Sequence, residues 1–111
     1  MSEPGDHSRY AGLDLLASSV LLVGPEFEVR YANPAAENLL ELSLKSLQRA
    51  PLTELFTNGQ ELSALCTQAL AHQYADLRQD LALQRNGREP LHVNSIVSAL
   101  GEGMLLIELR E

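Results

Sequence analysis

The chain has 111 residues, the size of a single domain. Acidic residues outnumber basic ones 15 to 8, and the formal net charge is −7. This surplus argues against nucleic acid and anionic membrane surfaces as partners, because both are themselves negative. The single cysteine excludes an intramolecular disulfide and a four-cysteine metal site. We therefore expect a soluble cytoplasmic protein with no nucleic-acid partner, no membrane contact and no metal site.

The N-terminal part of the chain divides into two segments. Residues 1–8 are polar with a proline and a glycine, and we expect them to be disordered. Residues 9–18 are predicted to form a short N-terminal helix. Its apolar stripe consists of Tyr10, Leu13 and Leu16, which recur three residues apart.

Two strands are predicted next. The apolar run 20–23 has a β-branched residue at each end and is typical of a strand buried on both faces. Residues 28–31 alternate between polar and apolar side chains, as in a strand with one solvated face. The Gly-Pro-Glu segment 24–26 predicts a turn between them. The two strands are therefore expected to pair as a hairpin.

The junction after the second strand carries a helix-start signal. Asn33 is a good N-cap, because its side-chain oxygen can accept a bond from an N–H of the first turn. Pro34 then falls at the first helical position, where its missing N–H costs nothing. Glu37 lies near the positive end of the helix dipole. We expect a helix from Pro34 to about Leu42.

The middle of the chain is predicted to be helical. Two or three short pieces are expected over residues 43–56, interrupted by a proline. A longer amphipathic helix is predicted over 60–72, with Asn58 as its cap and Glu61 reaching back. The apolar face of this helix consists of Leu62, Leu65, Cys66, Ala69 and Leu70.

The last third of the chain changes to a period of two. Strands are expected over about 80–84, 90–99 and 104–110. The Asn-Gly pair at 86–87 suits a type I′ hairpin turn, and residues 101–103 predict a second turn. The predicted order is two strands, a helical middle and three strands.

This order resembles that of a PAS domain, and two motifs agree. The first is Val-Arg-Tyr-Ala-Asn-Pro-Ala-Ala-Glu at residues 29–37, and the second is the Asn-Gly pair. Residues 21–23, 31–40 and 51–56 are similar, more narrowly, to the N-terminal sensor domain of nitrogen-regulation histidine kinases of the NtrB family.

The resemblance implies an α+β fold of PAS type. Its five-stranded antiparallel sheet has the helices between strands 2 and 3 packed on one face, with an N-terminal helix added. Residues 9–111 are then one PAS domain, with residues 9–18 as the helix and 19–110 as the core.

The resemblance also implies a function. It points to a sensory and dimerisation module of a cytoplasmic two-component sensor histidine kinase for nitrogen regulation. Such a parent is a homodimer whose kinase core acts with a PII-type signal protein and a response regulator. This sequence shows no phospho-acceptor histidine motif and no glycine-rich nucleotide lid. We therefore expect a non-catalytic domain without catalytic residues.

The alternative is a PAS receptor domain with a small-molecule ligand or cofactor in an apolar pocket between sheet and helices. Cys66 lacks the surroundings of a flavin-reactive cysteine, and His72 lies at a helix end, unlike a haem ligand. A filled core without a cofactor is the simpler interpretation. The pocket-lining candidates are Tyr31, Leu39, Leu62, Leu65, Cys66, Leu83, Val93 and Ile107.

The other face of the predicted sheet is polar except for Ile96 and Leu106. Two apolar residues on a solvated face suggest that another element covers them. The candidate is the stripe of Tyr10, Leu13 and Leu16, packed on its own sheet or on a second subunit. We expect a symmetric homodimer built from this helix and this face.

Overall fold

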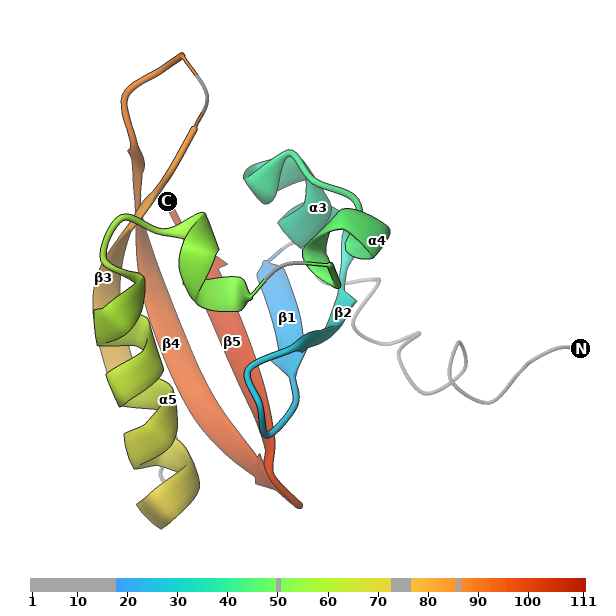
Figure 1. Ribbon diagram of the computed structural model, residues 1–111, viewed down its shortest axis with the longest axis vertical. Coiled ribbons are helices and arrows are strands. Elements are labelled where there is room, and N and C mark those ends of the chain that lie inside the picture. Colours follow the sequence, from blue (N-terminus) through green and yellow to red (C-terminus); the bar gives the residue numbers. More distant parts are fainter. Residues whose placement is uncertain (1–17, 50, 73–76, 86) are drawn as a thin grey trace, which may run out of the picture.

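The computed structural model describes residues 18–49, 51–72, 77–85 and 87–111. Its centre is a five-stranded antiparallel sheet with the order β2-β1-β5-β4-β3 (Figure 1). The first and the last strand are therefore neighbours in the middle of the sheet. The strands are β1 (Ser19–Val23), β2 (Val29–Ala32), β3 (Leu77–Leu83), β4 (Leu91–Gly101) and β5 (Met104–Arg110).

The helices lie between β2 and β3 in the chain and on one face of the sheet (Figure 1). They are α3 (Pro34–Leu40), α4 (Leu44–Leu47), the 3₁₀ helix η1 (Leu52–Leu55) and α5 (Gly59–His72). α5 packs on β3 and β4, whereas α3 contacts β1 and β2, and α4 contacts β2. This arrangement confirms the predicted PAS fold. The predicted N-terminal helix lies, apart from Ser18, outside the described residues.

β1 is buried on both faces, as its apolar run predicts. Leu21 and Val23 belong to the core between the sheet and the helices. Val20 and Leu22 alternate with them and face the opposite side, yet only 3% and 6% of their surfaces are exposed. β1 lies between β2 and β5 in the sheet and is buried along its whole length. This position accounts for the absence of polar residues after Ser19.

β2 contains an irregularity that changes which side chains face the core. Val29 pairs with Val23, but Tyr31 pairs with Leu22, and the register shifts between them. A bulge places one extra residue, here Arg30, opposite the partner strand and reverses the alternation. Val29 therefore enters the core and Tyr31 lies on the other face with Leu22. The register thus places Tyr31 on the opposite face from the other predicted pocket residues.

α3 begins as predicted, with Asn33 as N-cap and Pro34 at the first turn. It ends at Leu40, two residues earlier than expected, because Glu41 adopts a left-handed conformation with φ of 59°. The backbone N–H of Glu41 donates to Glu37 O in this cap. The chain then turns, and the carboxylate of Glu37 accepts a bond of 2.7 Å from Leu44 N at the start of α4.

Asn58 directly precedes α5 as predicted, and its carbonyl accepts from Glu61 N at 3.0 Å, but its side chain binds β3 instead of a helix N–H. Its side-chain Oδ1 accepts from Ala82 N at 3.0 Å, and its Nδ2 donates to Asp80 O at 2.9 Å. The amide thus pairs with the outer edge of β3 in the way that a further strand would. α5 begins directly after it at Gly59, whose missing side chain leaves room for the backbone of Thr53.

The connection between β3 and β4 is longer than the predicted two-residue turn. The ladder ends at the pair Leu83–Leu91. A turn is present at the expected place, because Arg88 N donates to Arg85 O at 3.4 Å. Gly87 has a φ of 69°, whereas the asparagine before it lies outside the described residues.

Candidate functional site

Five of the eight predicted pocket residues meet in the core between α5 and the sheet. None of these five exposes more than 3% of its surface. They are Leu62, Cys66, Leu83, Val93 and Ile107. Leu39 and Leu65 are half-buried and pack against this cluster. Tyr31 lies on the other face of the sheet. The lining of a ligand pocket by these residues stays a prediction.

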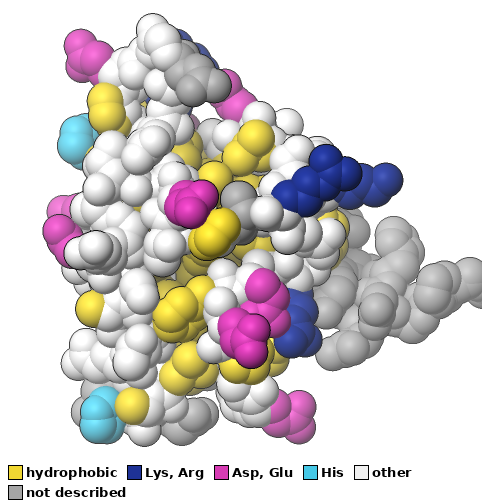
Figure 2. All heavy atoms as spheres, viewed as in Figure 1, with side chains coloured by type: hydrophobic (Ala, Val, Ile, Leu, Met, Phe, Trp, Pro, Cys, Tyr) yellow, Lys and Arg dark blue, Asp and Glu magenta, His cyan; other side chains and the backbone are white. Residues whose placement is uncertain are grey.

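A shallow apolar strip follows the edge of this core. Figure 2 shows hydrophobic side chains along the middle of the helical face, with charged side chains mainly around them. The half-buried residues packed against the core include Phe27, Leu65, Leu70 and Ala99.

Cys66 is buried in α5 and is a free thiol. Burial raises the pKa of this thiol to about 12, because the thiolate would lose its hydration. The nucleophilic form is therefore suppressed at neutral pH. Cys66 behaves as a small hydrophobic residue of the core.

The described part of the chain lacks two other kinds of site. No group of three or more His, Cys, Asp or Glu residues among the described residues could hold a metal ion. Within the same residues, no helix has the length and apolar character needed to cross a membrane.

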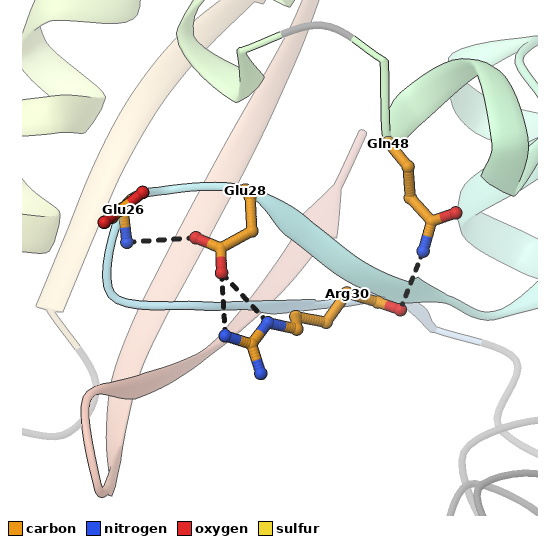
Figure 3. Close-up of polar contacts among 4 residues, drawn as sticks. All are labelled: Glu26, Glu28, Arg30 and Gln48. Carbon is orange, nitrogen blue, oxygen red and sulfur yellow. Dashed lines mark hydrogen bonds and ion pairs between the residues drawn. The ribbon is translucent and has the colours of Figure 1, made fainter.

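The outer edge of β2 is tied to the end of α4 (Figure 3). Gln48 Nε2 donates to Arg30 O at 3.3 Å. The carboxylate of Glu28 accepts from Glu26 N at 3.0 Å and forms an ion pair of 2.8 Å with Arg30. Partial burial acts to raise the pKa of Glu28, but these bonds and one from its own backbone outweigh it and lower that pKa.

A side-chain amide thus engages each edge strand, Gln48 on β2 and Asn58 on β3. Open edges invite pairing with another chain, and covered edge groups discourage it. The faces of this sheet are therefore better suited than these parts of its edges for contact with a partner.

The face opposite the helices carries four apolar residues at its centre. Val20, Leu22 and Ile96 are 3%, 6% and 7% exposed, and Leu106 is half-buried. The ladder places Leu22 beside Leu106, and Ile96 pairs with Glu108 next to Val20. We call these four residues the outer patch. The predicted partners of this face, Tyr10, Leu13 and Leu16, lie outside the described residues.

Sequence reasoning identified Ile96 and Leu106 but missed Val20 and Leu22. An apolar run indicates burial on both faces without saying what covers each face. It also missed the ion pair of 2.6 Å between Arg88 and Glu41, which are 47 positions apart. No local pattern connects residues at that separation.

Comparison with known proteins places this fold and sequence in a family. No family model matches the chain. It is 35% identical over 98 residues, 87% of its length, to the sensory histidine kinase/phosphatase NtrB of Klebsiella oxytoca. It is 32% identical to the PAS domain of nitrogen regulation protein NR(II) from Vibrio parahaemolyticus, with a TM-score of 0.72. That match covers 93% of this chain and 96% of the other. The chain belongs to the PAS domain family and is NtrB-like.

A third comparison shows how far the fold extends beyond this family branch. A domain of the sensory box sensor histidine kinase/response regulator from Geobacter sulfurreducens has a TM-score of 0.73 at 16% identity. It covers 96% of this chain and 94% of that domain, and it shows the shared fold alone. The PAS domain spans 28% of the length of the NtrB from Klebsiella oxytoca. It corresponds to the PAS sensor domain of NtrB-like histidine kinases.

Proposed function

We propose that this PAS domain is the sensory and dimerisation module of a nitrogen-regulation histidine kinase and that it signals to the kinase core of its parent protein. The similarity to NtrB over 87% of the chain carries this proposal. The parent acts in the cytoplasm, where a PII-type signal protein and a response regulator are its partners. The domain itself performs no chemistry.

The topology supports a route for the signal. β1 and β5 are neighbours at the centre of the sheet, and Ser19 pairs with Leu109. The chain thus enters the domain and leaves it at adjacent positions. A change in packing against the outer patch acts directly on both strands, because Val20 and Leu22 lie on β1 and Leu106 lies on β5.

The outer patch supports a homodimer. Leu106 is half-buried, so part of the patch is accessible to another chain, and the helices α3, α4 and α5 all lie on the other face (Figure 1). Apolar side chains on a sheet face favour contact with another apolar surface. We propose that the stripe of Tyr10, Leu13 and Leu16 provides this surface in a symmetric dimer.

A domain exchange tests the function. Residues 1–111 would replace the corresponding segment of the Klebsiella oxytoca NtrB, with autophosphorylation and phosphoryl transfer to its response regulator as readouts. We expect the kinase with the exchanged domain to show regulated autophosphorylation and phosphoryl transfer. The matched control carries the Geobacter sulfurreducens domain, which shares the fold at 16% identity. A kinase that behaves like one without any sensor domain would contradict the proposal.

Sedimentation velocity tests the dimer separately. The full chain is expected to sediment as a dimer, and a chain of residues 19–111 as a monomer. Leu106→Glu should also weaken the dimer, because it places a charge in an apolar contact. Leu100→Glu is the control, since Leu100 is 55% exposed. An unchanged dimer mass after removal of residues 1–18 would rule this interface out.

The apolar strip on the helical face supports a second candidate function, a receptor for a small apolar ligand. Its half-buried residues, such as Phe27 and Leu65, offer contact area beside the core. Native mass spectrometry after gentle purification tests it. A bound molecule that Leu65→Glu removes would favour the receptor, and a ligand-free mass would favour the proposal above.

A further inference from the structure

A small cavity lies where the end of α3 meets the connection between β3 and β4. Its volume is about 250 Å³. Leu40 and Leu42 contribute apolar surface, and the other lining residues are polar or charged. These are Glu41, Gln84, Arg85 and Arg88.

The local backbone positions the charged groups of this cavity. Glu41 is the left-handed cap of α3, and its carboxylate forms the 2.6 Å ion pair with Arg88. Nε and Nη2 of Arg85 both donate to Glu89 O, at 3.0 and 2.9 Å. The guanidinium of Arg85 is thus held by its own loop while it lines the cavity. A guanidinium that is already oriented loses less entropy when it binds an anion.

The charge balance at this place is opposite to that of the whole chain. The net charge of the protein is −7, but here two guanidinium groups face one carboxylate. The cavity at the start of α5 is lined by Glu61 without a basic residue, and the cavity beside His92 is lined by Asp80 and Glu111. A concave site with a local positive charge concentrates small anions.

We propose that this cavity binds a small carboxylate that carries a short aliphatic chain. The planar carboxylate matches the fork of a guanidinium group, and the aliphatic chain contacts Leu40 and Leu42. The volume is below that of pockets for drug-sized ligands, which are roughly 300–1,000 Å³. One net positive charge suits a monoanion.

The ion pair between Glu41 and Arg88 does not block such a ligand. Both side chains are about half exposed, 56% for Glu41 and 51% for Arg88. Ion pairs that face water exchange readily for other partners. A bound carboxylate would then link the segment between β3 and β4, through Arg85, to α3. This gives the sensor domain a second site for an input signal, separate from the outer patch.

Titration with sodium butyrate, followed by ¹⁵N–¹H NMR of the full chain, tests the site. We expect backbone amides of residues 40–42 and 84–89 to shift and to saturate at millimolar butyrate. Sodium chloride at the same ionic strength should leave them in place. Inorganic phosphate should bind at least fivefold more weakly, because it has no aliphatic part.

Three variants decide the assignment, with the NMR spectrum of each showing that it is folded. Arg85→Gln should weaken butyrate binding at least tenfold, whereas Arg78→Gln on β3 should change it less than twofold. Glu41→Gln should tighten binding severalfold, because it frees the guanidinium of Arg88. Shifts that do not saturate, that survive Arg85→Gln or that weaken in Glu41→Gln would overturn the proposal. Phosphate binding equal to butyrate binding would overturn the carboxylate specificity.

Discussion

The side-chain oxygen of Asn33 lies 3.0 Å from the backbone nitrogen of Val20 and accepts a hydrogen bond from it. The backbone N–H of Asn33 donates in return to Val20 O at 3.1 Å. The same oxygen accepts from Ala36 N at 2.9 Å, and Nδ2 donates to Ser18 O. Asn33 is fully buried. One side chain thus starts α3 and also fastens it to β1.

Asn33→Ala is expected to lower the free energy of unfolding by about 2–4 kcal/mol, because two buried backbone N–H groups lose their acceptor. The loss of an ordinary N-cap costs only about 1 kcal/mol. Urea unfolding measures the difference. The matched control is Ser43→Ala, which removes the exposed cap bond of 3.2 Å to Ser46 N and should cost about 1 kcal/mol or less. Equal losses of unfolding free energy in the two variants would show that Asn33 acts only as an ordinary N-cap.

Asn58→Ala is expected to release the outer edge of β3. Ala82 N and Asp80 O lose their side-chain partner, so unfolding should become about 1–2 kcal/mol easier. Hydrogen exchange gives a sharper readout, because the amide of Ala82 should lose protection. Asn58→Asp is the control, since it keeps an acceptor for Ala82 N, loses the donor and adds a negative charge beside Glu61. An unaltered exchange rate at Ala82 in the alanine variant would contradict the edge-closing role.

Cys66 should react with a disulfide reagent only when the domain unfolds. Its buried thiol has a pKa of about 12, so at pH 8 only about one molecule in ten thousand carries the thiolate. Labelling at pH 8 is expected to be at least 100-fold slower than that of the same chain in concentrated urea. Fast labelling of the folded protein, without a loss of structure in circular dichroism, would show that α5 opens locally.

The ion pair between Arg88 and Glu41 should be visible in acid titration. The hydrogen bond and charge of Arg88, followed by the charge of Arg85, lower the pKa of Glu41 below the usual 4.5. A carboxyl whose pKa is lower in the folded state stabilises the fold above its unfolded pKa, and this contribution is lost as the pH falls through the folded value. The affected window therefore lies below pH 4.5.

Arg88→Gln should raise the pKa of Glu41 back towards 4.5, and Arg85→Gln should raise it by less. An NMR titration of the side-chain carboxyl carbon measures both changes. Arg78→Gln serves as the control and should leave the value in place. A pKa of Glu41 that is the same with and without Arg88 would show that the ion pair does not persist in solution.

Local patterns predicted much of the fold. Asn33 and Pro34 marked the start of α3, and the apolar run of β1 predicted its burial on both faces. The apolar face of α5 identified Leu62 and Cys66 as core residues. These predictions succeed because periodicity and capping depend on residues only a few positions apart.

The structure differs from the predictions at positions where the side chain contacts residues that are distant in the sequence. The bulge at Arg30 turned Tyr31 away from the core, and the side chain of Asn58 binds the edge of β3 instead of an N–H of α5. Neither event has a signal in the residues next to it. Pairing with β1 sets the face on which Tyr31 lies, and the edge of β3 binds the side-chain amide of Asn58.

The sequence by itself determined the order of the strands and helices, the helix start at Asn33 and the likeness to NtrB-like PAS domains. Only the tertiary structure decided that Asn33 binds β1, that Val20 and Leu22 join the outer patch and that Arg88 meets Glu41. The reason is physical. Helix and strand patterns follow from the local geometry of the backbone, whereas these contacts exist only after pairing and packing bring distant segments together.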